Sequence, residues 1–393
     1  MRRRTIAAAA VLVLALAGVG AYAVVNGGGS GMLTVAWVSD TDRPNQVNHH
    51  PVAVAGSGED ATVLAPVSAV SGSGGHCRLV ALDANGSQRW SEGIADHACA
   101  IHGIGDPTVL DLTGDGDVEV VVPTAENAVY GYDVESGDRA FVGNTTSFGY
   151  SKPVLLDDPR RVFAIDFDGR AYAWHPNGSV AWNVSVDPAI IADPVVMNDR
   201  IVVGMTDATI ALHQNGTRAW SVPVGAEWLV QVDETHVVAS NGARVTSIDT
   251  DTKTVDWTLD TAGRAVVHDV VDGDRDGTRE VYVGSRGGRV LAVNATTGAV
   301  EWRTRLSETT DLTPAPIVGN FTASPGPEVA AVTHGGQVAI LDAATGETVA
   351  TYERDVAVWV HPTAADIDDD PLDELLVMYG DGRVVALDAP PAS

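Results

Sequence analysis

The sequence predicts an all-β protein, an eight-bladed β-propeller with four-stranded antiparallel blades. Three observations predict it. A phrase of about ten residues recurs along the chain, as in ALDANGSQRW at 81–90 and AVNATTGAVEW at 292–302. Each copy holds an Asn/Asp/Gly turn between two strand-like runs, the pattern of a β-hairpin. After residue 31 no stretch shows a convincing 3.6-residue apolar period, so we expect almost no helix there.

The recurring phrase sets the blades in order, because its copies are 36 to 50 residues apart, the length of one blade. We assign the eight blades to residues 49–95, 102–142, 150–187, 190–224, 227–261, 264–306, 311–354 and 358–388. A count of seven is the alternative, since blade 1 has the longest spacing and a loose Gly/Ser loop at 71–75.

The last copy stops after its third strand, so blade 8 needs a fourth strand from elsewhere. Residues 33–38 (LTVAWV) read like the fourth strand of the other blades, with Trp37 in the place of Trp90 or Trp302. We expect this N-terminal strand to complete blade 8 and close the ring, which removes free sheet edges. The propeller then spans residues 32–390.

The N-terminus predicts export. Three arginines, Arg2 to Arg4, precede an uncharged apolar run at 6–25. Residues 1–25 are expected to form one hydrophobic helix, which serves either as a transmembrane anchor or as a cleaved signal peptide. Residues 26–31 (NGGGSG) form a Gly-rich linker. In both cases the propeller lies outside the cytoplasm, anchored to the cell membrane or secreted.

The charge excludes some partners. The formal net charge is −28, so binding to nucleic acid or adsorption to anionic lipid is not expected. Asp outnumbers Glu, and Lys152 and Lys253 are the only lysines. A dense surface of short acidic side chains stays hydrated at high salt. The composition resembles that of proteins from extreme halophiles, particularly haloarchaea.

The phrase D-x-x-T/S-G-x-x-x-W resembles the tryptophan-docking repeat of the PQQ-type propellers. These include quinoprotein alcohol dehydrogenases and the non-enzymatic outer-membrane assembly lipoproteins of the BamB type. The copy at 294–302 matches best, with Asn294 in place of Asp. The resemblance implies that the tryptophans dock adjacent blades. It also implies two functions: a scaffold that binds envelope proteins or glycans, and, as the alternative, a PQQ-dependent oxidoreductase.

We favour the non-catalytic scaffold over the oxidoreductase. A PQQ site of that family needs Glu, Asn and Asp around a calcium ion, and no such set is recognisable in the sequence. No G-x-S-x-G, H-E-x-x-H or P-loop motif occurs either. We therefore expect no PQQ and name no catalytic residue.

Three acidic loops, each just before a strand, follow the pattern D-x-D/T-x-D-G/P-x-x-E. Oxygen ligands at positions 1, 3, 5 and 9 and a backbone carbonyl at position 7 suit Ca²⁺. The loops resemble the FG-GAP calcium loops of integrin-type propellers, and we expect structural Ca²⁺. The candidate ligands are Asp111, Thr113, Asp115, Asp117 and Glu119; Asp272, Asp274, Asp276, Thr278 and Glu280; and Asp366, Asp368, Asp370, Leu372 and Glu374.

Blade 7 carries the same register without most of the carboxylates, at Asn320, Thr322, Ser324 and Glu328. We expect no tight ion there. The third loop departs from the pattern at Pro371, where the other two have Gly. The alternative for all three loops is that Asp and Gly are there for their turn preference alone.

An X-Pro step opens the innermost strand of six blades. Where these steps face a central channel, His50, Asp106 and His361 are expected to converge, with His49 and His102 nearby. Such a set could bind a transition metal or an anionic ligand. The alternative is that they are solvated polar residues at the channel mouth.

The chain has two cysteines, Cys77 and Cys99. In an exported protein an even number permits a disulfide, which here would tie blade 1 to the entry of blade 2. Two buried thiols are the alternative.

Overall fold

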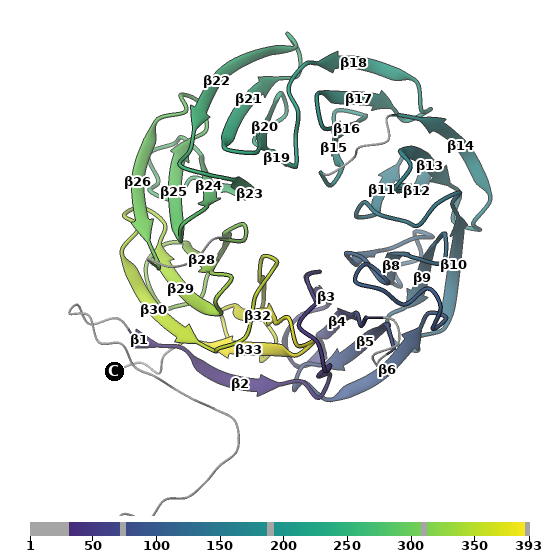
Figure 1. The fold of residues 1–393 in the computed structure, drawn as a ribbon, viewed down its shortest axis with the longest axis horizontal. Helices are drawn as coiled ribbons and strands as arrows, with labels where there is room; N and C mark the ends of the chain where they lie inside the picture. The colour runs from purple at the N-terminus through teal and green to yellow at the C-terminus, as the bar shows by residue number, and fades with distance from the viewer. Residues whose placement is uncertain (1–30, 71–75, 187–191, 308–312, 390–393) are drawn as a thin grey trace, which may run out of the picture.

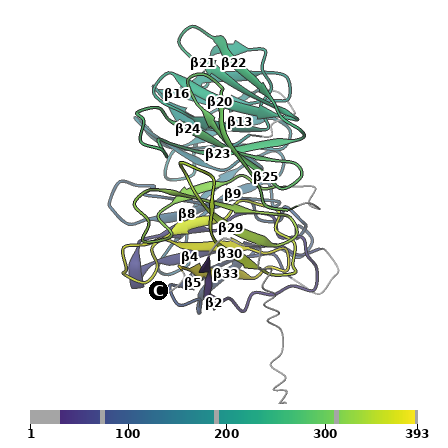
Figure 2. The same cartoon turned by 90° about the vertical axis from the view of Figure 1, so that its left-hand side faces the viewer.

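The computed structural model describes residues 31–70, 76–186, 192–307 and 313–389. In this part of the chain eight antiparallel sheets form a ring (Figure 1). The prediction of eight four-stranded blades is confirmed, and the alternative of seven is excluded. Seen from the side in Figure 2, β21 and β22 of blade 5 lie at the opposite end of the ring from β2 and β33, where the chain closes.

The first four blades each take four consecutive strands, ordered from the channel outward. Blade 1 has β3 (Ala53–Ala55), β4 (Thr62–Val67), β5 (Arg78–Asp83) and β6 (Gln88–Gly93). Blade 2 has β7 (Thr108–Leu110), β8 (Glu119–Thr124), β9 (Ala128–Asp133) and β10 (Arg139–Asn144). Blade 3 has β11 (Val154–Asp157), β12 (Arg160–Ile165), β13 (Arg170–Trp174) and β14 (Val180–Ser185). Blade 4 has β15 (Val195–Met197), β16 (Arg200–Gly204), β17 (Thr209–His213) and β18 (Arg218–Val222).

The last four blades repeat this order, except that blade 8 borrows a strand. Blade 5 has β19 (Trp228–Gln231), β20 (His236–Asn241), β21 (Arg244–Asp249) and β22 (Thr254–Asp260). Blade 6 has β23 (Ala265–Val271), β24 (Glu280–Ser285), β25 (Arg289–Asn294) and β26 (Val300–Arg305). Blade 7 has β27 (Ile317–Gly319), β28 (Glu328–Val332), β29 (Gln337–Asp342) and β30 (Thr348–Glu353). Blade 8 has β31 (Thr363–Ala365), β32 (Glu374–Met378) and β33 (Val384–Asp388).

The N-terminal strand β2 (Thr34–Val38) closes the ring, as predicted. It pairs antiparallel with β33 in the register Thr34↔Asp388 and Trp37↔Ala386 (Figure 1). Val63 and Leu82 of blade 1 pack with Leu376 of blade 8 in one buried cluster, so the closing interface is an ordinary part of the core. The contact is the same kind of interface that joins the other blades.

One short strand was not foreseen. β1 (Gly31–Met32) pairs in parallel with β30 of blade 7, at Gly31↔Ala350 and Met32↔Thr351. Gly31 was predicted to lie in the linker, because a run of glycines gives no strand signal. The linker is therefore one residue shorter than predicted, and the chain crosses from blade 7 to blade 8 before it closes the ring.

Burial follows position within a blade. The second strands are largely buried, and β4 and β8 are buried along their whole length, because both faces of a second strand contact neighbouring blades. Outer strands are more exposed, and in β26 half-buried residues alternate with exposed ones. Runs of Val, Leu and Ala therefore mark the middle of each blade, and polar residues with spaced tryptophans mark its rim.

The tryptophans of the repeated phrase hold adjacent blades together, as the resemblance implied. At five interfaces the indole N–H donates to a backbone carbonyl of the next blade at 2.7–2.8 Å. The pairs are Trp37–Ala84, Trp90–Val134, Trp182–Gln214, Trp257–Ala295 and Trp302–Ala343. The ring also faces the turn glycine of that blade: a Cβ on Gly298 would lie 2.7 Å from Trp257.

Helix is nearly absent, as expected. The one helix in the described ranges is a short 3₁₀ turn, η1 (Gly58–Asp60). None of the described helices has the length and apolar character needed to cross a membrane. The hydrophobic helix predicted at 1–25 lies outside the described residues, and so does most of the linker at 26–31.

Candidate functional site

A central cavity of about 590 Å³ lies where the innermost strands begin. The residue before proline lines it in all six blades that carry an X-Pro step. These residues are His50, Asp106, Lys152, Asp193, Ala315 and His361. An innermost strand is a sheet edge, so a proline without an N–H group is tolerated at its start. The proline also keeps the preceding residue extended.

Of the three residues expected to converge, the structure pairs two. His50 Nδ1 lies 2.5 Å from a carboxylate oxygen of Asp106. His361 lines the same cavity, but its ring lies against His268, with centroids 4.2 Å apart. His268 Nδ1 in turn lies 2.6 Å from Asp269. The His50–Asp106 pair therefore lines the cavity, whereas the His268–Asp269 pair contributes only its histidine to the lining.

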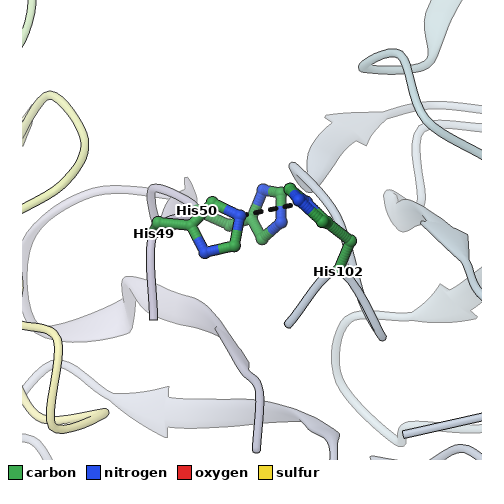
Figure 3. Close-up of side chains that lie close together, drawn as sticks. All are labelled: His49, His50 and His102. Atoms are coloured by element: carbon green, nitrogen blue, oxygen red, sulfur yellow. Dashed lines mark hydrogen bonds between the residues drawn. The ribbon is translucent and has the colours of Figure 1, made fainter. Parts of the chain in front are cut away.

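The residues named as neighbours, His49 and His102, are the ones that lie beside His50. Figure 3 shows the three rings together. His49 Nε2 lies 3.0 Å from His102 Nδ1, and His49 Nδ1 lies 2.7 Å from the Val47 carbonyl. The ring centroids of His49 and His50 are 4.3 Å apart. Three imidazoles from two separate segments of the chain thus share one site.

The cavity favours neutral imidazoles. Burial, and then the neighbouring His50, lower the pKa of His49 to about 3, and burial lowers the pKa of His102. Burial, and then His268, lower the pKa of His361 to about 3. Burial opposes ionisation of Asp106, but the facing His50 outweighs it and lowers the pKa of Asp106 to about 2. At neutral pH these histidines offer lone pairs, and Asp106 is a carboxylate.

Aromatic side chains form part of the lining of the cavity. Trp359 is 43% exposed, and its ring centroid lies 4.0 Å from that of His334. Trp228 and Tyr150 also line the cavity. Together they give the mouth an apolar contact surface in a protein whose surface is otherwise strongly acidic.

His268 and Asp269 are the site residues that the sequence analysis missed. Blade 6 has no X-Pro step, so the pattern that located the other residues gave no signal there. The ladder between β23 and β24 shifts register between Val267 and Val270. His268 and Asp269 lie within this irregularity, and His268 lines the cavity. A His-Asp pair interrupting a run of β-branched residues was the available signal.

Each of the three acidic loops joins the first two strands of its blade, and its last Glu is buried at the start of the second strand. The buried carboxylates are those of Glu119, Glu280 and Glu374. Each accepts a backbone N–H from the start of its loop at 2.7–2.9 Å, from Leu112, Gly273 and Ile367 respectively. The final Glu therefore makes the same contact in all three loops, as expected from their common sequence pattern.

The middle of each loop folds as successive Asx turns. The carboxylate at position 5 accepts the N–H of position 7 in all three loops. These pairs are Asp115–Asp117, Asp276–Thr278 and Asp370–Leu372. Thr113 is exposed in the first loop.

The second and third loops gather carboxylates. Oxygen atoms of Asp272, Asp274 and Asp276 lie within 4.8 Å of one another, and so do those of Asp366, Asp368 and Glu374. In each loop the Oε1 atom of the final Glu is buried without a hydrogen-bond partner, and so is Oδ1 of Asp272. Burial raises the pKa of Glu280 and that of Glu374 to about 7.

The first loop differs, because Arg160 of blade 3 lies beside it. An Arg160 nitrogen is 3.4 Å from Oδ1 of Asp111, and the same carboxylate accepts the N–H of Gly114 at 2.6 Å. Asp111 thus already has a cationic partner.

The loop of blade 7 satisfies its glutamate internally. The backbone N–H groups of Phe321 and Thr322 donate to Oε2 of Glu328, at 2.8 and 3.1 Å. The Thr322 hydroxyl donates to Oε1 of the same carboxylate. A hydroxyl here occupies the position where Asp274 and Asp368 stand in the other loops.

The two cysteines lie together. The structure joins Cys77 and Cys99 by a disulfide, with their Cα atoms 5.3 Å apart. Cys77 precedes β5 of blade 1, and Cys99 lies in the connection that leads to blade 2, where the sequence analysis placed the bridge.

Comparison with known proteins places this fold. Residues 143–236 and 167–390 match the family model described as outer membrane protein assembly factor BamB. The chain belongs to this family. The matched residues cover more than half of the chain, from the end of blade 2 to blade 8. Blades 1 and 2 have the same four-stranded architecture in the structure. No curated protein matches the chain significantly.

Solved structures agree with the fold. BamB from Moraxella catarrhalis is 19% identical and has a TM-score of 0.65, over 92% of this chain and 99% of that one. The computationally designed Ika8 protein is 13% identical, with a TM-score of 0.63 over 88% and 98%. BBS1N, solved in complex with ARL6DN, is 12% identical, with a TM-score of 0.53 over 73% and 92%. At these identities the likeness establishes the propeller alone.

The cavity does not fit the quinone cofactor of the related dehydrogenases. The described residues that line it include neither Glu nor Asn, which the family's cofactor site uses around calcium. Of the two carboxylates that line it, Asp106 is paired with His50, and Asp193 accepts the backbone N–H of Lys152. We therefore derive no chemistry through PQQ.

Proposed function

We propose that this BamB-family protein is a non-catalytic scaffold of the cell envelope that binds another envelope protein at the mouth of its channel. The observation that carries the proposal is the match of the chain to the BamB family model, joined to a complete propeller ring. The proposal includes export, with the N-terminal segment acting as an anchor or as a cleaved signal.

The aromatic mouth is the part of the surface best suited to such a partner. A surface with a formal net charge of −28 repels most acidic proteins, and salt screens its attraction to basic ones. Burial of apolar surface is not screened and is strengthened by many salts. Exposed Trp359 beside His334 therefore gives a contact that works at the high ionic strength to which the composition is suited.

Photo-cross-linking in the native envelope tests this proposal. A benzophenone amino acid replaces Trp359, and a matched control replaces Val180, which is 49% exposed on outer strand β14 of blade 3. We expect one discrete protein adduct from position 359 and none from position 180. Adducts with polysaccharide alone, equal adducts at both positions, or no adduct would overturn it.

A second experiment tests the alternative function. Purified protein supplied with PQQ and Ca²⁺ is assayed for reduction of a redox dye with alcohol substrates. We expect no reduction above a control without protein. Turnover would favour a PQQ-dependent oxidoreductase and refute the scaffold.

We also propose that Ca²⁺ stabilises the blades through the acidic loops. The second and third loops have the better sites, because each holds clustered carboxylates and a buried glutamate oxygen that lacks a hydrogen-bond donor. A hard dication supplies that missing partner and neutralises the cluster. In the first loop Arg160 competes for Asp111, so we expect weaker binding there.

A further inference from the structure

We propose that His49, His50 and His102 form a binding site for one divalent transition-metal ion, with Zn²⁺ as the reference case. Each histidine contributes one ring nitrogen to a group of three that lie within 4.8 Å of one another (Figure 3). His49 and His50 stand before β3 of blade 1, and His102 stands before β7 of blade 2. An ion held by all three would join the inner ends of two blades.

Two of the rings are oriented to present a lone pair. A carboxylate of Asp106 faces His50 Nδ1 at 2.5 Å, so that nitrogen carries the proton. The Val47 carbonyl does the same for His49 Nδ1 at 2.7 Å. When such a ring is neutral, Nε2 is the electron-pair donor. An acceptor that fixes the far nitrogen of a histidine is the usual outer contact of a metal-bound imidazole.

The buried Nε2 atom of His50 has no hydrogen-bond partner among the described residues. A lone pair that is neither hydrated nor hydrogen-bonded is costly, and protein structures rarely leave one without cause. A metal ion at this point would satisfy it. This atom is the observation that separates a metal site from a simple group of packed histidines.

The spacing is close to that of a metal site. His49 Nε2 and His102 Nδ1 are 3.0 Å apart, and His102 donates this hydrogen bond because His49 Nε2 carries the lone pair. Two nitrogens bound tetrahedrally to zinc at about 2.0–2.1 Å lie about 3.3 Å apart. Binding therefore needs a small separation of the rings and the transfer of the His102 proton from Nδ1 to Nε2. Starting from three neutral rings, binding releases no proton.

Three protein nitrogens leave a fourth position, which faces the cavity and is open to water or to a ligand atom. Imidazole ligands suit Zn²⁺, Cu²⁺ and Ni²⁺, whereas the acidic loops offer only oxygen, which suits Ca²⁺. The two kinds of site are thus separable by the choice of ion. The proposal does not rest on the scaffold function.

Metal binding to the full chain tests the site. Ca²⁺ is kept saturating to occupy the acidic loops, Zn²⁺ is titrated against a chromogenic chelator, and Co²⁺ is followed by its visible absorption. We expect one ion per chain with a nitrogen-rich cobalt spectrum. His50→Ala and His102→Gln should each abolish it or weaken it more than tenfold, and Asp106→Asn should weaken it about 10–100-fold.

Two controls exclude other metal sites. His236 lies near Asp249 and Asp256 in a second group of possible ligands, and His175 is exposed in a hairpin turn of blade 3. His236→Gln and His175→Gln should leave the stoichiometry and affinity unchanged. Absence of binding, loss of binding in His236→Gln, or retention in both His50→Ala and His102→Gln would overturn the proposal. Circular dichroism of each variant distinguishes lost binding from lost folding.

Discussion

The indole N–H of Trp37 donates to the backbone carbonyl of Ala84 at 2.7 Å. This contact joins β2, the strand that completes blade 8, to blade 1. Four other tryptophans make the same contact between consecutive blades. At this one interface, however, the two partners belong to blades that are last and first in the chain, so the bond helps to close the circle.

Replacing Trp37 should loosen the closing interface. Trp37→Ala removes a half-buried ring and its hydrogen bond, for an expected loss of about 2–3 kcal/mol in unfolding free energy. Trp37→Phe keeps most of the packing and should cost about 1 kcal/mol. Urea denaturation measures both. Amide exchange in β2 should speed up in Trp37→Ala and stay unchanged in Trp302→Ala. Equal exchange in the two variants would contradict a special role for Trp37.

The turn glycines should be sensitive to substitution where a tryptophan faces them. Gly298 has a φ of +72°, and a Cβ there would lie 2.7 Å from the Trp257 ring. Gly242 has a φ of +56° with nothing within 4 Å of its Cβ position. Gly242→Ala should cost about 1 kcal/mol from backbone strain alone. Gly298→Ala should lower the melting temperature clearly further, because the clash adds to the strain. An equal loss of stability in the two variants would show that the Trp257 ring moves aside without cost.

Calcium should raise the melting temperature, and a chelator should lower it, because an ion that binds only the folded state stabilises it. Glu280→Gln should remove much of this response by weakening the second loop. Glu328→Gln is the matched control, since its loop in blade 7 already satisfies its carboxylate. Differential scanning fluorimetry with and without Ca²⁺ measures the response. If a chelator left the melting temperature unchanged, Ca²⁺ would not stabilise the protein, and the prediction would be wrong.

Acid should destabilise the channel. Folding lowers the pKa of His361 to about 3, whereas the unfolded chain has a histidine pKa of about 6.5. As the pH falls below 6.5 the unfolded state takes up the proton first, so stability is complete above that pH and decreases toward pH 3. At pH 5 the loss from this residue is at most about 2 kcal/mol.

His49 adds a loss of the same sign. Urea unfolding at pH 7.5 and pH 5 should show a smaller decrease in His361→Gln than in the natural protein. An identical decrease in both proteins would mean that His361 is charged or solvated in the folded state.

Reduction of the Cys77–Cys99 bridge should cost about 3 kcal/mol, the loop-closure entropy for a separation of 22 residues. Unfolding with and without a reductant measures it. Cys77→Ser with Cys99→Ser should match the reduced protein, and a reductant should have no effect on that double variant.

The propeller ring was predictable because its sequence signals are local and recur in every blade. Each copy of the phrase carries its own turn residues and its own tryptophan, so the blade count and the role of Trp37 follow from spacing. β1 was not predictable, since Gly31 and Met32 pair through backbone groups alone. Their side chains give no strand pattern.

The channel was predictable only in part. The X-Pro steps placed His50, Asp106 and His361 around one cavity, because proline marks the start of an innermost strand. The contacts between side chains within the cavity depend on their rotamers and on the irregularity at His268. Residue spacing predicts neither of these. The hydroxyl of Thr322 that satisfies Glu328 was likewise visible only in three dimensions.

The pairing of β2 with β33 also has a consequence for biosynthesis. Thr34 is synthesised long before its partner Asp388. Until β33 has been synthesised, β2 remains an unpaired strand edge, and blade 1 lacks its neighbour blade 8. Such edges are where nascent chains aggregate. An arrested or truncated chain of this protein should therefore depend on chaperones far more than its finished form does.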